Sequence, residues 1–200
     1  MLDRILNFKT KPISISECDN YTEFSVLIPI LINKNNYELL YEIRSENLKN
    51  QPNEICFPGG KIEKGESKEE AAKRETVEEL LIDSDDVNII GPSDIMVTPF
   101  NTIVYPYVGI IKNYEYTYNN DEVKEVFTVP LSFFLYNEPQ CHYIDVSLAP
   151  QNDFPYHLIQ KGKDYRWGKG KYPVYFYIYK DKIIWGITAR ITYDFIKYIR

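Results

Sequence analysis

The chain has 200 residues, of which 44% are hydrophobic and 15% are aromatic. This length and composition fit one globular domain with a substantial core and exclude a disordered chain. The net charge of −6, from 29 acidic against 23 basic residues, argues against nucleic-acid binding, which needs a broad basic surface.

The cysteines and the hydropathy bear on location. Cys18, Cys56 and Cys141 lie far apart and form no CxxC pair, so the spacing indicates neither a zinc ribbon nor a disulfide framework. The N-terminal segment lacks the apolar run of a signal peptide, and no stretch of about 20 apolar residues predicts a membrane span. We therefore expect a cytoplasmic protein with no membrane partner.

Hydrophobic periodicity and turn residues predict the elements of the chain in order. The first part is expected to contain a short helix at residues 2–8, strands at 23–32 and 37–43, a loop at 49–54, a short strand at 55–57 and a backbone bend at 58–60. The second part is expected to contain a helix at 67–81, strands at 87–91, 102–112 and 126–130, a short helix at 131–136, a hairpin at 172–186 and a final helix at 188–200. This order predicts one α/β domain with a mostly mixed sheet and two main helices.

Helical periodicity also predicts which sides of the two main helices are packed. Val77, Leu80 and Leu81 are expected to face the sheet from the first of these helices. The packing side of the final helix is expected to comprise Ala189, Ile191, Thr192, Phe195, Ile196 and Ile199.

The helix predicted at 67–81 carries an unusual group of acidic side chains. Ser67 and Glu70 form a Ser-x-x-Glu capping box, which indicates where the helix begins. Glu75, Glu78 and Glu79 then fall within a sector of about 100° on the helix surface. Like charges four residues apart cost a few tenths of a kcal/mol, so the group calls for an explanation.

Two explanations are open for this acidic sector. A solvent-exposed helix face often carries such charges. The Phe-Pro-Gly-Gly segment just upstream favours the second explanation, because glycines allow close backbone approach and exposed carbonyl oxygens. Clustered carboxylates beside a bent backbone form an all-oxygen site, which suits Mg²⁺ or Mn²⁺ better than zinc.

The same stretch resembles the Nudix box, Gly-x5-Glu-x7-Arg-Glu-U-x-Glu-Glu-x-Gly-U, where U is a bulky apolar residue. The chain departs from this pattern at Thr76, which replaces an aliphatic residue, and at Leu81, which replaces a glycine. Neither departure alters a carboxylate. The positions that match in register are Gly60, Glu66, Arg74, Glu75, Glu78, Glu79 and Ile82.

A longer segment is similar to the signature of coenzyme A pyrophosphatases within the Nudix family. It runs from Arg44-Ser45 through Lys49 and Asn53 to the Phe-Pro-Gly-Gly segment, with Lys49 in place of an arginine and Asn53 in place of a glycine. Asparagine tolerates the left-handed backbone that glycine would supply, whereas lysine keeps the charge without the bidentate fork. With the Trp-Gly-Ile-Thr-Ala-Arg segment near the C-terminus, the resemblance covers the chain from about residue 23 to its end.

This resemblance implies a Nudix-type α/β/α sandwich with a mixed β-sheet, formed as a single domain over residues 1–200 with residues 1–22 flanking it. It implies metal-dependent hydrolysis of the diphosphate of coenzyme A or a derivative, giving 3′,5′-ADP and 4′-phosphopantetheine. Two alternatives stay open: a Nudix pyrophosphatase for ADP-ribose, dinucleotides or nucleoside triphosphates, and a non-catalytic nucleotide sensor. Because family members often pair, a homodimer is also left open.

The resemblance further implies roles for individual residues. The carboxylates of Glu75, Glu79 and Glu78 and the carbonyl oxygen of Gly60 would bind Mg²⁺ or Mn²⁺. Arg74 would orient these glutamates through salt bridges, although a purely structural role is an equal alternative.

Three further assignments concern the substrate and the attacking water. Glu122 is the first candidate for an additional catalytic carboxylate and Glu125 the second, although both also fit exposed loop charges. Arg44 and Lys49 are expected to bind the substrate phosphates, including the 3′-phosphate of coenzyme A. Arg190 is expected to be a buried partner of a carboxylate.

Two aromatic residues near the C-terminus complete the candidates. Tyr165 and Trp167 are either part of the substrate channel or, as the preferred interpretation, packing residues.

Overall fold

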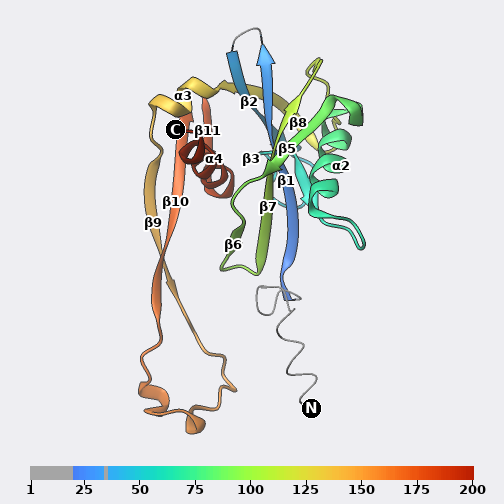
Figure 1. The fold of residues 1–200 in the computed structure, drawn as a ribbon. Coiled ribbons are helices and arrows are strands. Elements are labelled where there is room, and N and C mark those ends of the chain that lie inside the picture. Colours follow the sequence, from blue (N-terminus) through green and yellow to red (C-terminus); the bar gives the residue numbers. More distant parts are fainter. Residues whose placement is uncertain (1–19, 34–35) are drawn as a thin grey trace, which may run out of the picture.

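A computed structural model describes residues 20–33 and 36–200 (Figure 1). The helix predicted at residues 2–8 lies outside the described residues. The main elements in chain order are β1 (Thr22–Asn33), β2 (Asn36–Arg44), β3 (Ile55–Cys56), β4 (Gly59–Lys61), α2 (Lys68–Leu80), β5 (Val87–Pro92), β6 (Met96–Thr98), β7 (Thr102–Ile111), β8 (Val123–Pro130), α3 (Leu131–Tyr136), β9 (Gln140–Ser147), β10 (Lys169–Tyr179), β11 (Lys182–Trp185) and α4 (Gly186–Ile199).

The larger sheet is mixed, as the sequence predicts. Its hydrogen-bonded order is β3-β2-β1-β7-β5, with β4 added on β1, β6 on β7 and β8 on β2. Strands β1 and β7 are parallel over Thr22–Leu31, and the other pairs are antiparallel. The short strand β4 pairs with the first half of β1, and this pairing brings the two glycines of the Phe-Pro-Gly-Gly segment beneath α2.

Alternate side chains of the central strands supply two separate cores, one on each face of the large sheet. On β1, Leu27 and Leu31 pack toward α2, where they meet Leu80. Ile28 faces the other way and belongs to the larger core, which contains residues of α3, α4, β10 and β11. Helices α2 and α4 therefore cover opposite faces of the sheet (Figure 1), which is the predicted α/β/α arrangement.

A second, three-stranded sheet has the order β11-β10-β9. Strands β9 and β10 extend past α4 as a long ribbon, whose far end carries residues 148–168 (Figure 1). Strand β9 was not predicted. Seven of its eight residues are exposed, so no apolar face marks it in the sequence.

The structure corrects three sequence expectations. Gly59 and Gly60 were expected to form only a bend, but they lie in the strand β4. Leu81 was expected to face the sheet but is 59% exposed, because it ends α2 in a left-handed conformation that turns its side chain outward. Ile199 was expected to pack but is 40% exposed, at the last turn of α4.

Candidate active site

The predicted capping box fixes the start of the glutamate-rich helix. The backbone N–H of Glu70 donates to Ser67 Oγ over 3.2 Å, and the backbone N–H of Ser67 donates to Glu70 Oε2 over 2.8 Å. These reciprocal bonds satisfy two backbone donors that a helix end otherwise leaves free. The helix phase that follows decides the direction of every glutamate after Glu70.

With this start of the helix, part of the acidic sector faces the interior of the protein and not the solvent. The buried residues of α2 are Ala71, Ala72, Thr76, Glu79 and Leu80. The prediction of separate acidic and packing sides was therefore wrong, because the side that packs on β1 and β4 includes Glu79. A solvated acidic face is excluded for this glutamate, which is only 5% exposed.

Glu79 is bound to the glycine strand. The backbone N–H of Gly59 donates to Glu79 Oε2 over 2.8 Å. Burial raises the pKa of Glu79 well above its usual value, and the nearby charge of Glu42 raises it further. A buried carboxylate of this kind has a strong tendency to take up a positive partner.

Gly60 makes room for a second glutamate. A Cβ atom at this position would lie 2.3 Å from the carboxyl carbon of Glu75, so no larger residue fits without displacing that carboxylate. Burial raises the pKa of Glu75, although a hydrogen bond from Arg74 opposes this effect. Glu75 also borders an open cleft of about 1480 Å³, which has Lys61 and Lys68 among its lining residues.

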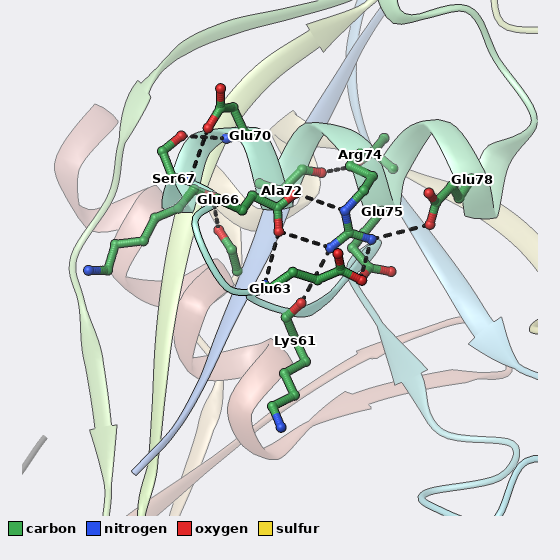
Figure 2. Close-up of polar contacts among 12 residues, drawn as sticks. Lys61, Glu63, Glu66, Ser67, Glu70, Ala72, Arg74, Glu75 and Glu78 are labelled. Atoms are coloured by element: carbon green, nitrogen blue, oxygen red, sulfur yellow. Dashed lines mark hydrogen bonds and ion pairs between the residues drawn. The ribbon is translucent and has the colours of Figure 1, made fainter. Parts of the chain in front are cut away.

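Arg74 joins three of the acidic side chains (Figure 2). Its Nη1 donates to Glu75 Oε1 over 2.8 Å and to Glu78 Oε2 over 3.2 Å. Its Nε donates to Glu66 Oε1 over 2.8 Å, and this bond is the main cause of the lowered pKa of Glu66. Glu66 also accepts from the backbone N–H of Glu63, which ties the loop before α2 to the helix.

Sequence reasoning missed Glu42, a fully buried carboxylate on β2. Cys56 Sγ donates to Glu42 Oε1 over 3.2 Å, whereas Glu42 Oε2 has no hydrogen-bond partner. Burial raises the pKa of Glu42 to about 7, and the charges of Glu122 and Glu75 contribute in the same direction. The alternation of side chains along β2 could have identified Glu42 as buried, because it lies on the same face of the strand as the buried Leu40.

The loop before β8 brings one of the two candidate loop glutamates to this cluster. The backbone N–H of Asn119 donates to the carbonyl of Glu79, and that of Ser45 donates to the carbonyl of Glu122. The charge of Glu122 raises the pKa of both Glu79 and Glu42. Glu125 instead pairs with Lys182 Nζ over 2.8 Å.

Arg44 lies at the end of the strand that carries Glu42. Its positive charge lowers the pKa of Glu42 and of Cys56, so it lies beside the cluster. Lys49 is exposed in the loop that follows. Asn53 in the same loop has a φ of 60°, as the substitution for glycine predicts, and its N–H donates to the carbonyl of Arg44.

The remaining candidates lie elsewhere. Tyr165 and Trp167 are in edge-to-face contact at 5.0 Å, in the tip of the β9–β10 ribbon, far from α2 within the same chain (Figure 1). They pack on each other, as the preferred interpretation states. Arg190 Nε donates to Asp194 Oδ2 over 2.7 Å, so the expected pairing with a carboxylate is confirmed, but the Arg190 side chain is 36% exposed and not buried.

The donor set fits a divalent cation that prefers oxygen ligands. Within residues 20–33 and 36–200, no three acidic, histidine or cysteine side chains converge as they stand to hold one ion. Glu75 and Glu78 are held by Arg74, and Glu79 by the N–H of Gly59. Glu42 Oε2 has no hydrogen-bond partner and is a further oxygen ligand near these carboxylates. Gly60 leaves space beside the carboxylate of Glu75. The residues present therefore suit Mg²⁺ or Mn²⁺.

A mixed sheet between two helices, with a buried acidic cluster between α2 and the sheet, defines an α/β protein with an all-oxygen site. A model of the NUDIX domain matches residues 23–144, which is more than half of the chain, and the chain therefore belongs to the Nudix hydrolase family. The family resemblance and the fold predicted from the sequence are both confirmed. Members of this family typically use a divalent metal.

Two curated relatives are similar to most of the chain. One is "Peroxisomal coenzyme A diphosphatase NUDT7" of Mus musculus, 36% identical over 140 residues, with 69% of this chain and 58% of that protein covered. The other is a Nudix hydrolase named NudL of Photorhabdus laumondii, 32% identical over 182 residues, with 88% of this chain and 84% of that protein covered. The chain thus spans less than two thirds of the mouse relative.

A solved structure agrees with the fold. The MutT/nudix family protein from Enterococcus faecalis has a TM-score of 0.50 at 15% identity, with 98% of this chain and 67% of that chain covered. Within the part of the chain that the structure describes, no helix is long and apolar enough to cross a membrane.

Proposed function

We propose that this chain is a coenzyme A diphosphatase, which hydrolyses the diphosphate of coenzyme A or a derivative to 3′,5′-ADP and 4′-phosphopantetheine. The observation that carries this proposal is the segment from Arg44 to Gly60. It resembles the signature of that subgroup, and in the structure it links the buried Glu42 to the glycines that hold Glu75 and Glu79. The similarity to a mouse protein named as a coenzyme A diphosphatase supports the same substrate.

The carboxylates of Glu75, Glu79 and Glu78 and the carbonyl oxygen of Gly60 would hold Mg²⁺ or Mn²⁺. A divalent cation at this site would offset the charge of the diphosphate and lower the pKa of a water molecule. Arg74 would orient Glu75, which borders the cleft, and Glu78 through its present hydrogen bonds to both carboxylates.

Glu122 is the proposed general base that takes the proton from the attacking water. It belongs to a loop that backbone hydrogen bonds attach to both α2 and β2, so its carboxylate is held near the cluster without being buried in it. Its side chain accepts one hydrogen bond, from Asn119 Nδ2 over 3.2 Å, and keeps oxygen lone pairs available for a proton.

Arg44 and Lys49 are the proposed phosphate-binding residues. Arg44 lies beside the acidic cluster, where a guanidinium is able to bind a phosphate through two parallel hydrogen bonds. Lys49 is exposed in the adjoining loop and would act as a second point charge. The cationic pair would bind the anionic groups that the acidic cluster alone would repel.

A panel of substrates tests the proposal. Purified enzyme with Mg²⁺ or Mn²⁺ is incubated with coenzyme A, dephospho-coenzyme A, ADP-ribose and a dinucleoside polyphosphate, and the products are separated by chromatography. We expect 4′-phosphopantetheine from coenzyme A and slower cleavage of the others. Glu79→Gln should be inactive, whereas Glu115→Gln, at an exposed loop residue, should behave like the wild type. Faster cleavage of ADP-ribose or the dinucleotide would identify another Nudix pyrophosphatase, and tight binding without any product would identify a sensor.

We also propose that residues 1–200 form a single Nudix domain with residues 1–22 flanking it. The cytoplasmic location stays a prediction from the sequence, since the mouse relative carries a peroxisomal name.

A further inference from the structure

The far end of the β9–β10 ribbon, residues 148–168, forms an ordered unit that we call the tip (Figure 1). It contains two short 3-10 helices. The ring of Phe154 meets the rings of Tyr156 and Trp167 edge to face, at 5.0 and 5.3 Å between centroids, and Tyr165 also packs on Trp167. These contacts hold the tip in one shape, so binding of a partner does not require the tip to become ordered first.

The tip exposes apolar side chains that its aromatic cluster does not cover. Leu158 is 74% exposed, Leu148 is 61% exposed and Tyr165 is 44% exposed. Exposed apolar residues are common on proteins and do not by themselves indicate a partner. Their chemistry narrows the choice of partner, because leucine inserts into hydrocarbon and tyrosine favours the boundary between hydrocarbon and water.

The charge of this segment is opposite to that of the rest of the chain. Residues 148–171 carry a net charge of +3, from five basic and two acidic residues, and the whole chain carries −6, so the remaining residues carry −9. All five basic side chains are exposed. An exposed basic segment attracts an anionic surface. The charged residues of this segment are Lys161, Lys163, Arg166, Lys169 and Lys171 against Asp153 and Asp164.

The ribbon separates this positive charge from the acidic body of the protein. Phe100, in the turn between β6 and β7, contacts Tyr172 of β10 with ring centroids 6.3 Å apart. From Tyr172, strand β10 extends three more residues toward the tip, to Lys169, which is about 10 Å at the usual strand spacing. The tip lies beyond that point, and Figure 1 shows it standing apart from the large sheet and from α2 and α4. Because the Debye length is about 8 Å at physiological ionic strength, repulsion between the body and an anionic surface at the tip is largely screened.

We propose that the tip binds the surface of an anionic phospholipid bilayer. Its basic side chains contact the phosphate groups of the lipids, and Leu148 and Leu158 insert among the acyl chains. Stable attachment to a membrane surface takes two signals, and the tip supplies basic charge and apolar side chains together. A nucleic acid would use the charge and the aromatic rings but not the leucines. Such a contact needs no membrane-spanning helix, so the expectation of no membrane partner, which rested on the lack of an apolar span, does not extend to it.

Binding to vesicles tests this inference, which is independent of the proposed substrate. The full chain is mixed with vesicles of phosphatidylcholine alone, or of phosphatidylcholine with phosphatidylglycerol, and the bound protein is measured by co-sedimentation. We expect binding to the anionic vesicles only, and binding at least about tenfold weaker at about 1 M salt, where the Debye length falls to about 3 Å. These measurements use the unmodified chain and need no variant to fold.

One pair of variants tests the contribution of charge. Lys161→Gln/Lys163→Gln should weaken binding to the anionic vesicles about tenfold or more, because both lysines then no longer attract the lipid phosphates. Lys112→Gln/Lys197→Gln removes the same charge at exposed positions outside the tip, and this matched control should bind like the wild type.

A second pair tests insertion into the lipid. Leu148→Ser/Leu158→Ser should weaken binding about tenfold or more at unchanged charge. Ile90→Ser/Ile95→Ser, at side chains that are 59% and 56% exposed elsewhere on the protein, is the matched control and should bind like the wild type.

Fluorescence reports directly on the position of the tip. Trp185→Phe leaves Trp167 as the only tryptophan of the chain, and brominated lipid in the anionic vesicles should quench its emission. Three results would overturn the inference: a wild type that does not sediment with the anionic vesicles, tip variants that bind like their controls, or bound protein in which Trp167 is not quenched. A wild type that binds a DNA duplex but not the vesicles would identify a nucleic-acid site and would equally overturn it.

Discussion

Replacing Glu42 by glutamine should make the metal-free protein more stable at alkaline pH. The folded state raises the pKa of this carboxyl group from the usual 4.5 to about 7, chiefly through burial. Between these two values the folded protein keeps a proton that the unfolded chain has released. Stability therefore falls as the pH rises through this window, and the loss is complete above pH 7.

The structure gives the size of the effect. A difference of about 2.5 pKa units corresponds to about 3 kcal/mol of unfolding free energy. Glu42→Gln has the shape of the protonated acid and remains neutral, and its amide oxygen still accepts from Cys56. The variant should match the wild type near pH 4.5 and exceed its stability by about 3 kcal/mol at pH 8.

Urea denaturation in the presence of a chelator, at pH 5 and pH 8, measures this difference. Glu115→Gln is the control, because this glutamate is exposed and its replacement should leave the pH dependence as in the wild type. Equal loss of stability between pH 5 and pH 8 in the wild type and in Glu42→Gln would refute the reasoning that Glu42 is buried with a retained proton.

The other predictions concern activity and the helix start. Gly60→Ala should displace the Glu75 carboxylate and lower Mn²⁺ affinity, measured by calorimetry, about tenfold or more. Gly91→Ala, where a Cβ meets nothing within 4 Å, should leave the affinity unchanged. Arg44→Ala should raise KM about tenfold for coenzyme A and less for dephospho-coenzyme A; equal increases in steady-state assays would remove its role at the 3′-phosphate. Ser67→Ala should lower the unfolding free energy by about 1 kcal/mol in denaturant titrations, because the capping box loses its hydroxyl.

Local signals were sufficient to predict the helix that carries the candidate site. The capping box at Ser67 and the spacing of Glu75, Glu78 and Glu79 fix the start and phase of α2, since both depend only on neighbouring residues. The same holds for the long apolar strands, whose side chains fill the two cores.

Contacts between distant segments could not be predicted in this way. The bond from Gly59 N–H to Glu79 depends on how β4 meets α2, and one sequence contains no record of that pairing. The alternation along β2 could have indicated that Glu42 is buried, but not that it lies beside the carboxylates of α2. The prediction that the acidic side of α2 faces away from the sheet was wrong for the same reason. A helix that contains both glutamates and small residues has two plausible packing sides. Strand β9 was not predicted because its side chains are exposed and, within the described residues, it pairs with β10 alone.

The cation site is the central claim, and a crystal grown with Mn²⁺ tests it most directly through anomalous diffraction. The account predicts a manganese peak within ligand distance of the carboxylates of Glu75 and Glu79 and of the Gly60 carbonyl oxygen, with Glu79 drawn away from the N–H of Gly59. A saturated crystal in which Glu79 still accepts from Gly59, Glu75 still pairs with Arg74, and no manganese lies near either carboxylate would contradict it.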